Sequence, residues 1–120
     1  EIIAAIDISV LPTDDSVGGT VILEAMAMAK PIIVTEGQSR GVREFVDNNE
    51  TGIIIPPKNP GFLADAIISL IKNKRVARRM GQNGRKKAEK RFDFNDHVKK
   101  VERLYLEVCR PNKLCFENAL

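Results

Sequence analysis

A glycine-bearing loop followed by a helix with a single carboxylate is the part of this sequence best suited to chemistry. Gly18, Gly19, Thr20 and Val21 lead into an otherwise apolar segment whose only charge is Glu24. Backbone N–H groups at the start of a helix carry partial positive charge, which suits a phosphate. A carboxylate beside such an anion site accepts hydrogen bonds from hydroxyls. The pattern therefore predicts a ligand with both phosphate and hydroxyl groups, such as a nucleotide or a nucleotide-sugar.

The elements on either side of this loop would hold it in place. Residues 8–11 have the pattern of a strand that Pro12 ends, and residues 19–29 have the pattern of a helix. All residues from 21 to 29 except Glu24 are apolar, which predicts a helix buried on almost every side. A strand, a loop and a helix in this order place the helix N-terminus outside the carboxyl end of the strand. A buried Glu24 would be costly unless it met a partner or a cleft.

The remainder of the chain alternates short aliphatic runs with helical patterns, which predicts an α/β fold with a parallel sheet. Asn59 and Asn73 are predicted to cap two of the helices, and Asp93 or Asn95 to cap the last one. The expected strands are 8–11, 32–34 and 52–55, and the expected helices are 19–29, 41–46, one from Pro60, 74–90 and one that ends before Pro111. The last helix is expected to turn an apolar face inward, made of Val98, Val101, Leu104, Tyr105 and Val108.

Three strands are few for a doubly wound sheet, and the chain starts with Glu1 inside a helical pattern. We therefore interpret the sequence as a piece of a longer protein. Residues 1–110 are expected to form a partial domain that binds a nucleotide or a nucleotide-sugar and ends in a C-terminal helix. Residues 111–120 are expected to form a tail.

The composition is that of an ordinary globular protein, with 43% of the residues hydrophobic and 29% charged. No apolar run is long enough to span a bilayer, and no signal peptide opens the chain. Cys109 and Cys115 lack the partners that a zinc site needs. These observations favour a cytoplasmic protein.

Positive charge is concentrated between Lys72 and Arg91, where ten residues are Lys or Arg and one, Glu89, is acidic. A surface for nucleic acid would interleave aromatic residues for stacking, and none lies between Phe62 and Phe92. We therefore expect no nucleic-acid partner. Two interpretations stay open: a solvated helix face, or contact with an anionic membrane surface.

Several segments, in order, resemble the signature of the group 1 (family 4) glycosyltransferases. Those enzymes commonly read E-G-F-G-x-x-x-L-E-A-M-A-x-G-x-P-V-I-A-T where this chain has residues 16–35. The similar segments are 16–27, 30–35, 41–46, 51–56, 63–67, 79–85 and 91–94. An ordered series of this kind is specific, whereas a single Gly-Gly-Thr would be weak.

The resemblance implies a GT-B architecture, in which two Rossmann-like domains enclose the active site in a cleft. This chain would be the later part of the C-terminal, donor-binding domain, with a parallel sheet and flanking helices. The second Glu of the family's E-x7-E pattern binds the donor ribose and corresponds to Glu24. The loop amides that approach the donor sugar and diphosphate correspond to Gly18, Gly19, Thr20 and Val21. The implied reaction is retaining and uses neither a metal nor a cofactor.

The chain departs from the family pattern at three positions. Ser16, an expected donor contact, stands where the first Glu of E-x7-E belongs, and a hydroxyl lacks the charge that stabilises a forming oxocarbenium centre. Gly18 replaces the bulky residue of the loop. Ala29 replaces a Gly, which costs about 1 kcal/mol if the backbone there is left-handed.

The sequence thus predicts the donor-binding part of a glycosyltransferase that uses a nucleotide-diphosphate-sugar in glycan, polysaccharide or glycolipid synthesis. No complete catalytic set lies in this segment, because the family's diphosphate-binding Arg and Lys lie upstream. The expected partners are the donor, a missing N-terminal acceptor domain and an anionic membrane, at the inner face of which the protein would work. One alternative is a non-catalytic nucleotide-binding or interaction module, which Ser16 favours. Another is an isomerase on the same scaffold, which would need a base that this segment does not show.

Overall fold

Three short parallel strands form the centre of the first unit of the chain, residues 1–90. The computed structural model describes residues 2–13, 19–37 and 41–109. The strands are β1 (Ser9–Leu11), β2 (Ile32–Thr35) and β3 (Ile53–Ile55), and they lie in the order β1-β2-β3. Val10 pairs with Ile33, and Val34 pairs with Ile54. The predicted parallel sheet is confirmed.

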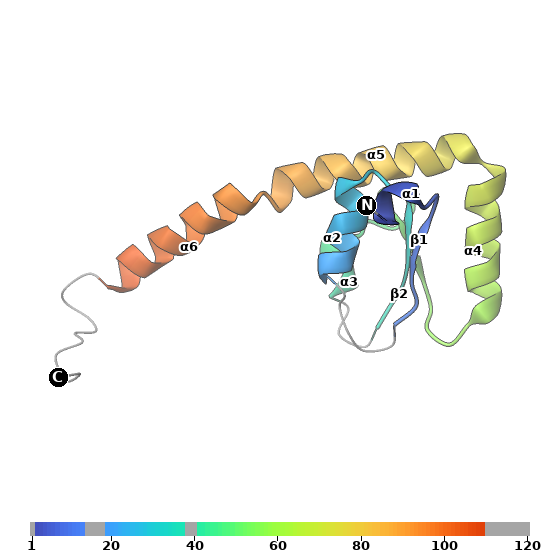
Figure 1. Ribbon diagram of the computed structural model, residues 1–120. Coiled ribbons are helices and arrows are strands. Elements are labelled where there is room, and N and C mark those ends of the chain that lie inside the picture. The colour runs from blue at the N-terminus through green and yellow to red at the C-terminus, as the bar shows by residue number, and fades with distance from the viewer. Residues whose placement is uncertain (1, 14–18, 38–40, 110–120) are drawn as a thin grey trace. The chain divides into compact units, whose positions relative to one another are not determined.

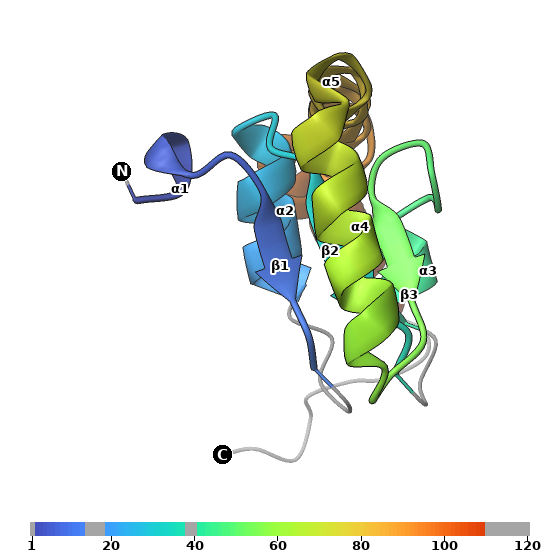
Figure 2. The same cartoon turned by 90° about the vertical axis from the view of Figure 1, so that its right-hand side faces the viewer.

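Helices cover both faces of this sheet. The described helices are α1 (Ile2–Ala5), α2 (Gly19–Ala27), α3 (Val42–Phe45), α4 (Pro60–Lys72), α5 (Lys74–Arg91) and α6 (Phe94–Val108). α2 and α3 lie on one face and α4 lies on the other (Figures 1 and 2). Two predicted caps are confirmed: the Asn59 side chain accepts from the Phe62 N–H at 3.1 Å, and that of Asn73 accepts from the Val76 N–H at 3.2 Å.

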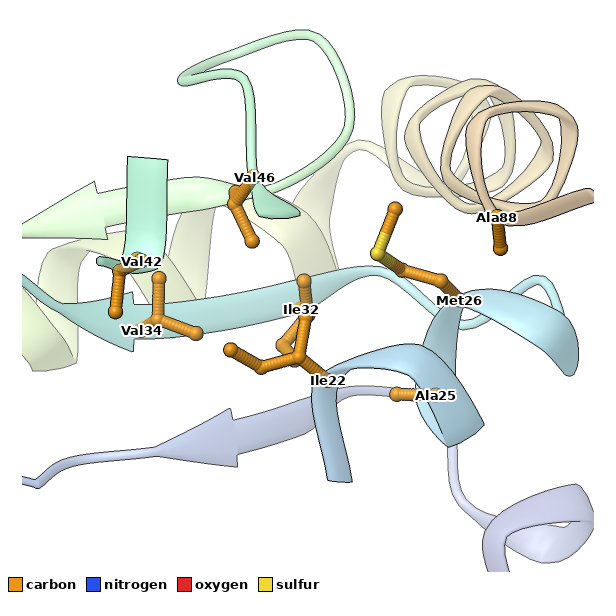
Figure 3. Close-up of a cluster of buried hydrophobic side chains, with 8 residues drawn as sticks. All are labelled: Ile22, Ala25, Met26, Ile32, Val34, Val42, Val46 and Ala88. Carbon is orange, nitrogen blue, oxygen red and sulfur yellow. The ribbon is translucent and has the colours of Figure 1, made fainter. Parts of the chain in front are cut away.

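The central strand β2 is buried on both faces, as the middle strand of a covered parallel sheet must be. Ile32 and Val34 point towards Ile22 and Met26 of α2, in a cluster that Figure 3 shows. Ile33 points to the opposite face, into a second cluster between the sheet and α4. That second cluster consists of Ile33, Ile55, Ala66, Leu70 and Met80.

α2 is buried on one face only, so the prediction that it is buried on almost every side is wrong. Ile22, Ala25 and Met26 are the buried residues, at the spacing of one helical stripe. Thr20, Val21, Glu24, Ala27 and Met28 are exposed. Composition alone could not show this, because apolar residues stand on both faces of α2. Glu24 therefore carries no burial cost.

α5 joins the two hydrophobic clusters, since Met80 belongs to one and Ala88 to the other. It does so by a close backbone contact. A Cβ on Gly81 would lie 2.0 Å from the carbonyl oxygen of Ala29, and one on Gly84 would lie 3.4 Å from Cγ of Met26. Gly81 in particular serves close packing rather than merely weakening the helix.

Polar side chains of α5 also hold the loop between α3 and β3. Nζ of Lys87 lies 2.8 Å from Oδ2 of Asp47, and the Lys87 side chain is only 8% exposed. Nδ2 of Asn83 donates to the carbonyl oxygen of Glu50 at 3.3 Å. These contacts fix the loop that leads into β3.

The second unit, residues 91–120, contains α6. Asp93 is its cap, because the carboxylate accepts from the N–H groups of Asn95 and Asp96. No residue of α6 is buried, so the prediction of an inward apolar face is wrong. Helical periodicity predicts that such a face exists, but it does not provide a neighbour to cover it. The apolar residues, all exposed, are Val98, Val101, Leu104, Tyr105 and Val108.

The contact of Gly81 predicts a large effect of a single methyl group. Gly81→Ala forces the added Cβ against the Ala29 carbonyl, and we expect a loss of about 1–3 kcal/mol in the free energy of unfolding in urea. Gly61→Ala is the control, because its Cβ would meet only the Asn59 side chain at 3.4 Å. Equal stability of the two variants would contradict this packing.

The turn after α2 gives a second prediction. Ala29 has φ 52°, a left-handed backbone that glycine adopts without strain. Ala29→Gly is expected to stabilise the chain by about 0.5–1 kcal/mol in thermal or urea unfolding, because strain relief outweighs the extra freedom of the unfolded chain. Ala27→Gly, in the helical last turn of α2, should instead destabilise it by up to about 1 kcal/mol. A loss in both variants would rule out strain at Ala29.

Candidate functional site

The carboxyl ends of the strands and the N-termini of α2 and α4 lie at the same edge of the sheet, the lower one in Figure 1. We call this the carboxyl edge. Parallel strands joined by helices produce such an edge, and open α/β sheets bind their ligands there. The predicted order of strand, loop and helix is therefore present, with α2 beginning beside the end of β1.

Four of the six predicted site residues lie in the described chain, all on α2. Thr20, Val21 and Glu24 are exposed, at positions that share one side of the helix. Gly19 lies against α3, since a Cβ there would come within 3.0 Å of Cζ of Phe45. The structure thus brings Thr20, Val21 and Glu24 together on the outward face. The other two predicted residues, Ser16 and Gly18, lie outside the described residues.

The charge arrangement on α2 suits a ligand with phosphate and hydroxyl groups. The first turn of the helix contains no acidic residue, so no carboxylate there would repel a phosphate. The carboxylate of Glu24, one turn further on, has no hydrogen-bond or ion-pair partner within the described ranges. It is free to accept hydrogen bonds from hydroxyls.

Two contacts at the carboxyl edge were missed by reasoning from the sequence. The hydroxyl of Thr35, at the end of β2, donates to the carbonyl oxygen of Thr13 in the segment after β1. Nε of Arg43 donates to Oε1 of Glu36, and this hydrogen bond together with the Glu36 charge raises the pKa of Arg43. Thr35 and Glu36 follow directly from a predicted strand, and that position was the available signal.

A cavity of about 310 Å³ lies at the same edge, on the α4 side of the sheet. Thr35, Ile55 and Lys58 line it, together with Asn59 at the start of α4. The Asn59 side chain already occupies the Phe62 N–H, so the N-terminus of α4 has fewer amides to offer a ligand. The capped N-terminus of α4 is therefore a weaker candidate for an anion site than a helix start with free amides.

The described residues show neither a metal-binding cluster nor a membrane-spanning helix. Within the ranges that the structure covers, no group of three or more His, Cys, Asp or Glu side chains could hold a metal ion. Likewise, none of the described helices is both long and apolar enough to cross a membrane.

Comparison with known proteins identifies the family. Residues 1–87 match the family described as "Glycosyl transferases group 1". The chain belongs to the group 1 glycosyltransferases. The resemblance seen in the sequence is thereby confirmed.

Relatives and solved structures agree with this assignment. The chain is 30% identical over 113 residues to N-acetyl-alpha-D-glucosaminyl L-malate synthase of Bacillus anthracis, which covers 94% of this chain and 29% of the relative. Its fold matches sucrose-phosphate synthase from Thermosynechococcus elongatus with a TM-score of 0.83 and 29% identity, over 89% of this chain and 26% of the other. Anabaena HepE has the same fold at a TM-score of 0.82 and 24% identity, over 88% of this chain and 29% of HepE.

The chain thus spans less than a third of the length of these group 1 glycosyltransferases. Their solved structures share its fold, so the predicted fold class, a GT-B domain with a parallel sheet and flanking helices, is confirmed. The site residues themselves stay a prediction, which is based on the position of α2 and on the family pattern.

The contact between Thr35 and Thr13 gives a prediction for the carboxyl edge. Thr35→Val keeps the shape of a buried side chain but removes the hydroxyl, and we expect a loss of about 1 kcal/mol in unfolding free energy. Hydrogen exchange of the Thr13 amide should also accelerate. Thr20→Val, at an exposed position, is the control and should change stability by less than about 0.5 kcal/mol. Unchanged exchange in Thr35→Val would show that this hydroxyl does not hold the loop.

Proposed function

We propose that this chain is the donor-binding part of a retaining glycosyltransferase, which transfers a sugar from a nucleotide-diphosphate-sugar to an acceptor. One observation carries the proposal: Glu24 stands exposed and unpaired within the described chain, on the side of α2 that also presents Thr20 and Val21. This carboxylate would accept hydrogen bonds from the donor ribose. The amides at the start of α2, from Gly18 to Val21, would face the diphosphate and sugar.

Transition-state stabilisation in such a reaction depends on neutralising the departing diphosphate. The amides at the start of α2 would supply part of the positive charge that neutralises the diphosphate, and we propose that cationic groups outside this chain supply the rest. An N-terminal acceptor domain would complete the cleft, in keeping with relatives more than three times as long. We therefore propose that the chain alone is inactive and needs no metal or cofactor to bind the donor.

The pathway is also part of the proposal, and the names of the relatives support it. We propose glycan, polysaccharide or glycolipid synthesis, in the cytoplasm and at the inner face of the membrane. The relatives include a capsular polysaccharide biosynthesis glycosyltransferase of Staphylococcus aureus, at 31% identity over 99 residues.

The alternative is a non-catalytic nucleotide-binding or interaction module derived from a donor domain. Ser16 favours it, because a hydroxyl replaces the carboxylate expected at the reacting centre. An interaction module predicts that no nucleotide changes the stability of the chain, whereas a donor site predicts stabilisation by ligand.

A ¹H–¹⁵N NMR titration of the chain tests the proposal, with UDP-glucose as the first ligand because HepE has been solved in complex with it. UDP, GDP and GDP-mannose follow. We expect chemical-shift changes confined to the stretch from Gly18 to Glu24. Glu24→Ala should weaken binding about ten- to a hundredfold, the effect of losing a hydrogen bond to a charged group.

Glu44→Ala is the matched control, because Glu44 is likewise an exposed helical Glu, on α3. It should leave the affinity unchanged. Equal weakening by both variants would show a general charge effect rather than a site at Glu24. A folded chain that no nucleotide perturbs would overturn the donor site and favour the interaction module.

A further inference from the structure

Positive charge gathers where α4 meets α5, in a cluster that we call the basic corner: Lys72, Lys74, Arg75, Arg78 and Arg79. All five side chains are exposed, and none has a carboxylate partner among the described residues. The C-terminal half of α5 differs, because Arg85 pairs with Glu89 and Lys87 pairs with Asp47. The charge excess of α5 is therefore least compensated at its N-terminal end.

Exposed apolar side chains lie beside this charge. Ile68 and Ile71, one turn apart at the end of α4, are 46% and 58% exposed. Ile71 lines a hollow of about 530 Å³ together with Lys74 and Arg78, and Asp7 is the single carboxylate in that lining. Apolar side chains framed by long cationic ones form an amphipathic surface.

We propose that the basic corner binds the surface of an anionic membrane. Phosphate groups of the lipid would pair with the five cationic side chains, whose aliphatic stems reach through the headgroup layer. The two isoleucines would enter the boundary between headgroups and acyl chains, as apolar residues of interfacial helices do. The choice of a membrane rests on the proposed function, which includes glycolipid synthesis at the inner face of the membrane.

The place of the basic corner in the fold supports this partner. The turn between α4 and α5 lies at the end of the sheet opposite the carboxyl edge, at the upper right of Figure 1. A membrane bound there leaves α2 and Glu24 uncovered. Donor binding and membrane binding can therefore be measured separately on the same chain.

A nucleic acid fits the surface less well. Its bases would need aromatic side chains for stacking, and the sequence has none between Phe62 and Phe92. Binding of a nucleic acid would also leave the exposed side chains of Ile68 and Ile71 without an apolar partner. An acidic protein would match the charge, and competition by one is an outcome of the experiment below.

Co-sedimentation with vesicles tests the proposal, using the full chain. Vesicles of phosphatidylcholine alone are compared with vesicles that also contain phosphatidylglycerol, at low and at high salt. We expect binding only to the anionic vesicles, weaker at high salt. The triple variant Arg75→Gln, Arg78→Gln, Arg79→Gln should bind about a hundredfold more weakly, from about fivefold for each charge removed.

A second triple variant, Arg85→Gln, Lys86→Gln, Lys90→Gln, is the matched control. It removes the same charge from exposed positions of the same helix, outside the basic corner. We expect it to retain most of the binding. Ile71→Ser should lower the binding that persists at high salt, whereas Ile2→Ser, exposed on α1, should not. Far-UV circular dichroism confirms that each variant is folded.

Several results would overturn the proposal. These are absence of binding to anionic vesicles, equal loss in the two triple variants, or stronger binding to RNA or to an acidic protein than to the vesicles. UDP-glucose titration of the same samples keeps the two proposals apart. Nucleotide binding without vesicle binding would contradict only the proposal for the basic corner. Vesicle binding without nucleotide binding would contradict only the proposal for the donor site.

Discussion

The contact between α5 and the turn after α2 is the constraint on which the rest of the first unit depends. The chain must reverse between α2 and β2 within a few residues, and Ala29 does this in a left-handed conformation. The carbonyl oxygen of Ala29 then points at Gly81, where there is no room for a side chain. Because this contact fixes α5 along its length, Met80 and Ala88 can each reach a different hydrophobic cluster. One helix thus stabilises both faces of the sheet.

The same constraint orients the candidate site. α2 is held by Ile22, Ala25 and Met26 against β2, and a rotation about its axis would bury Glu24 in place of one of them. The carboxylate is therefore kept outward by packing on the opposite side of the helix. Gly19 contributes at the N-terminal end, where its contact with the Phe45 ring brings α3 close to α2. Glu24 thus owes its position to apolar contacts that lie outside the site.

The features that could be predicted from the sequence are those with local causes. Asn59 and Asn73 cap helices through residues three positions away, and the strands are short aliphatic runs bounded by turn residues. The left-handed site at Ala29 was anticipated because the family has glycine there. What could not be predicted depends on residues far apart in the chain. Thr35 and Thr13 are 22 positions apart, and the room at Gly81 is set by a turn some fifty residues earlier.

The burial of α2 and α6 shows a second limit of reasoning from sequence. Both helices have apolar residues that the pattern assigns to the interior, yet Val21, Met28 and the whole apolar face of α6 are exposed. Periodicity defines a face, while burial requires a partner surface that the pattern does not describe.

The same distinction applies to α5, because its charge count predicted a basic segment but not how the charge is distributed along the helix. Ion pairs of Lys87 with Asp47 and of Arg85 with Glu89 compensate two cations in the C-terminal half of the helix, whereas the N-terminal half has no such pair among the described residues. The basic corner lies at the amino end of the sheet, and the carboxylate of Glu24, unpaired among the described residues, lies on the helix that starts at the carboxyl edge. A membrane held by the basic corner would therefore approach the end of the sheet opposite the candidate site, and the start of α2 would stay accessible to a nucleotide.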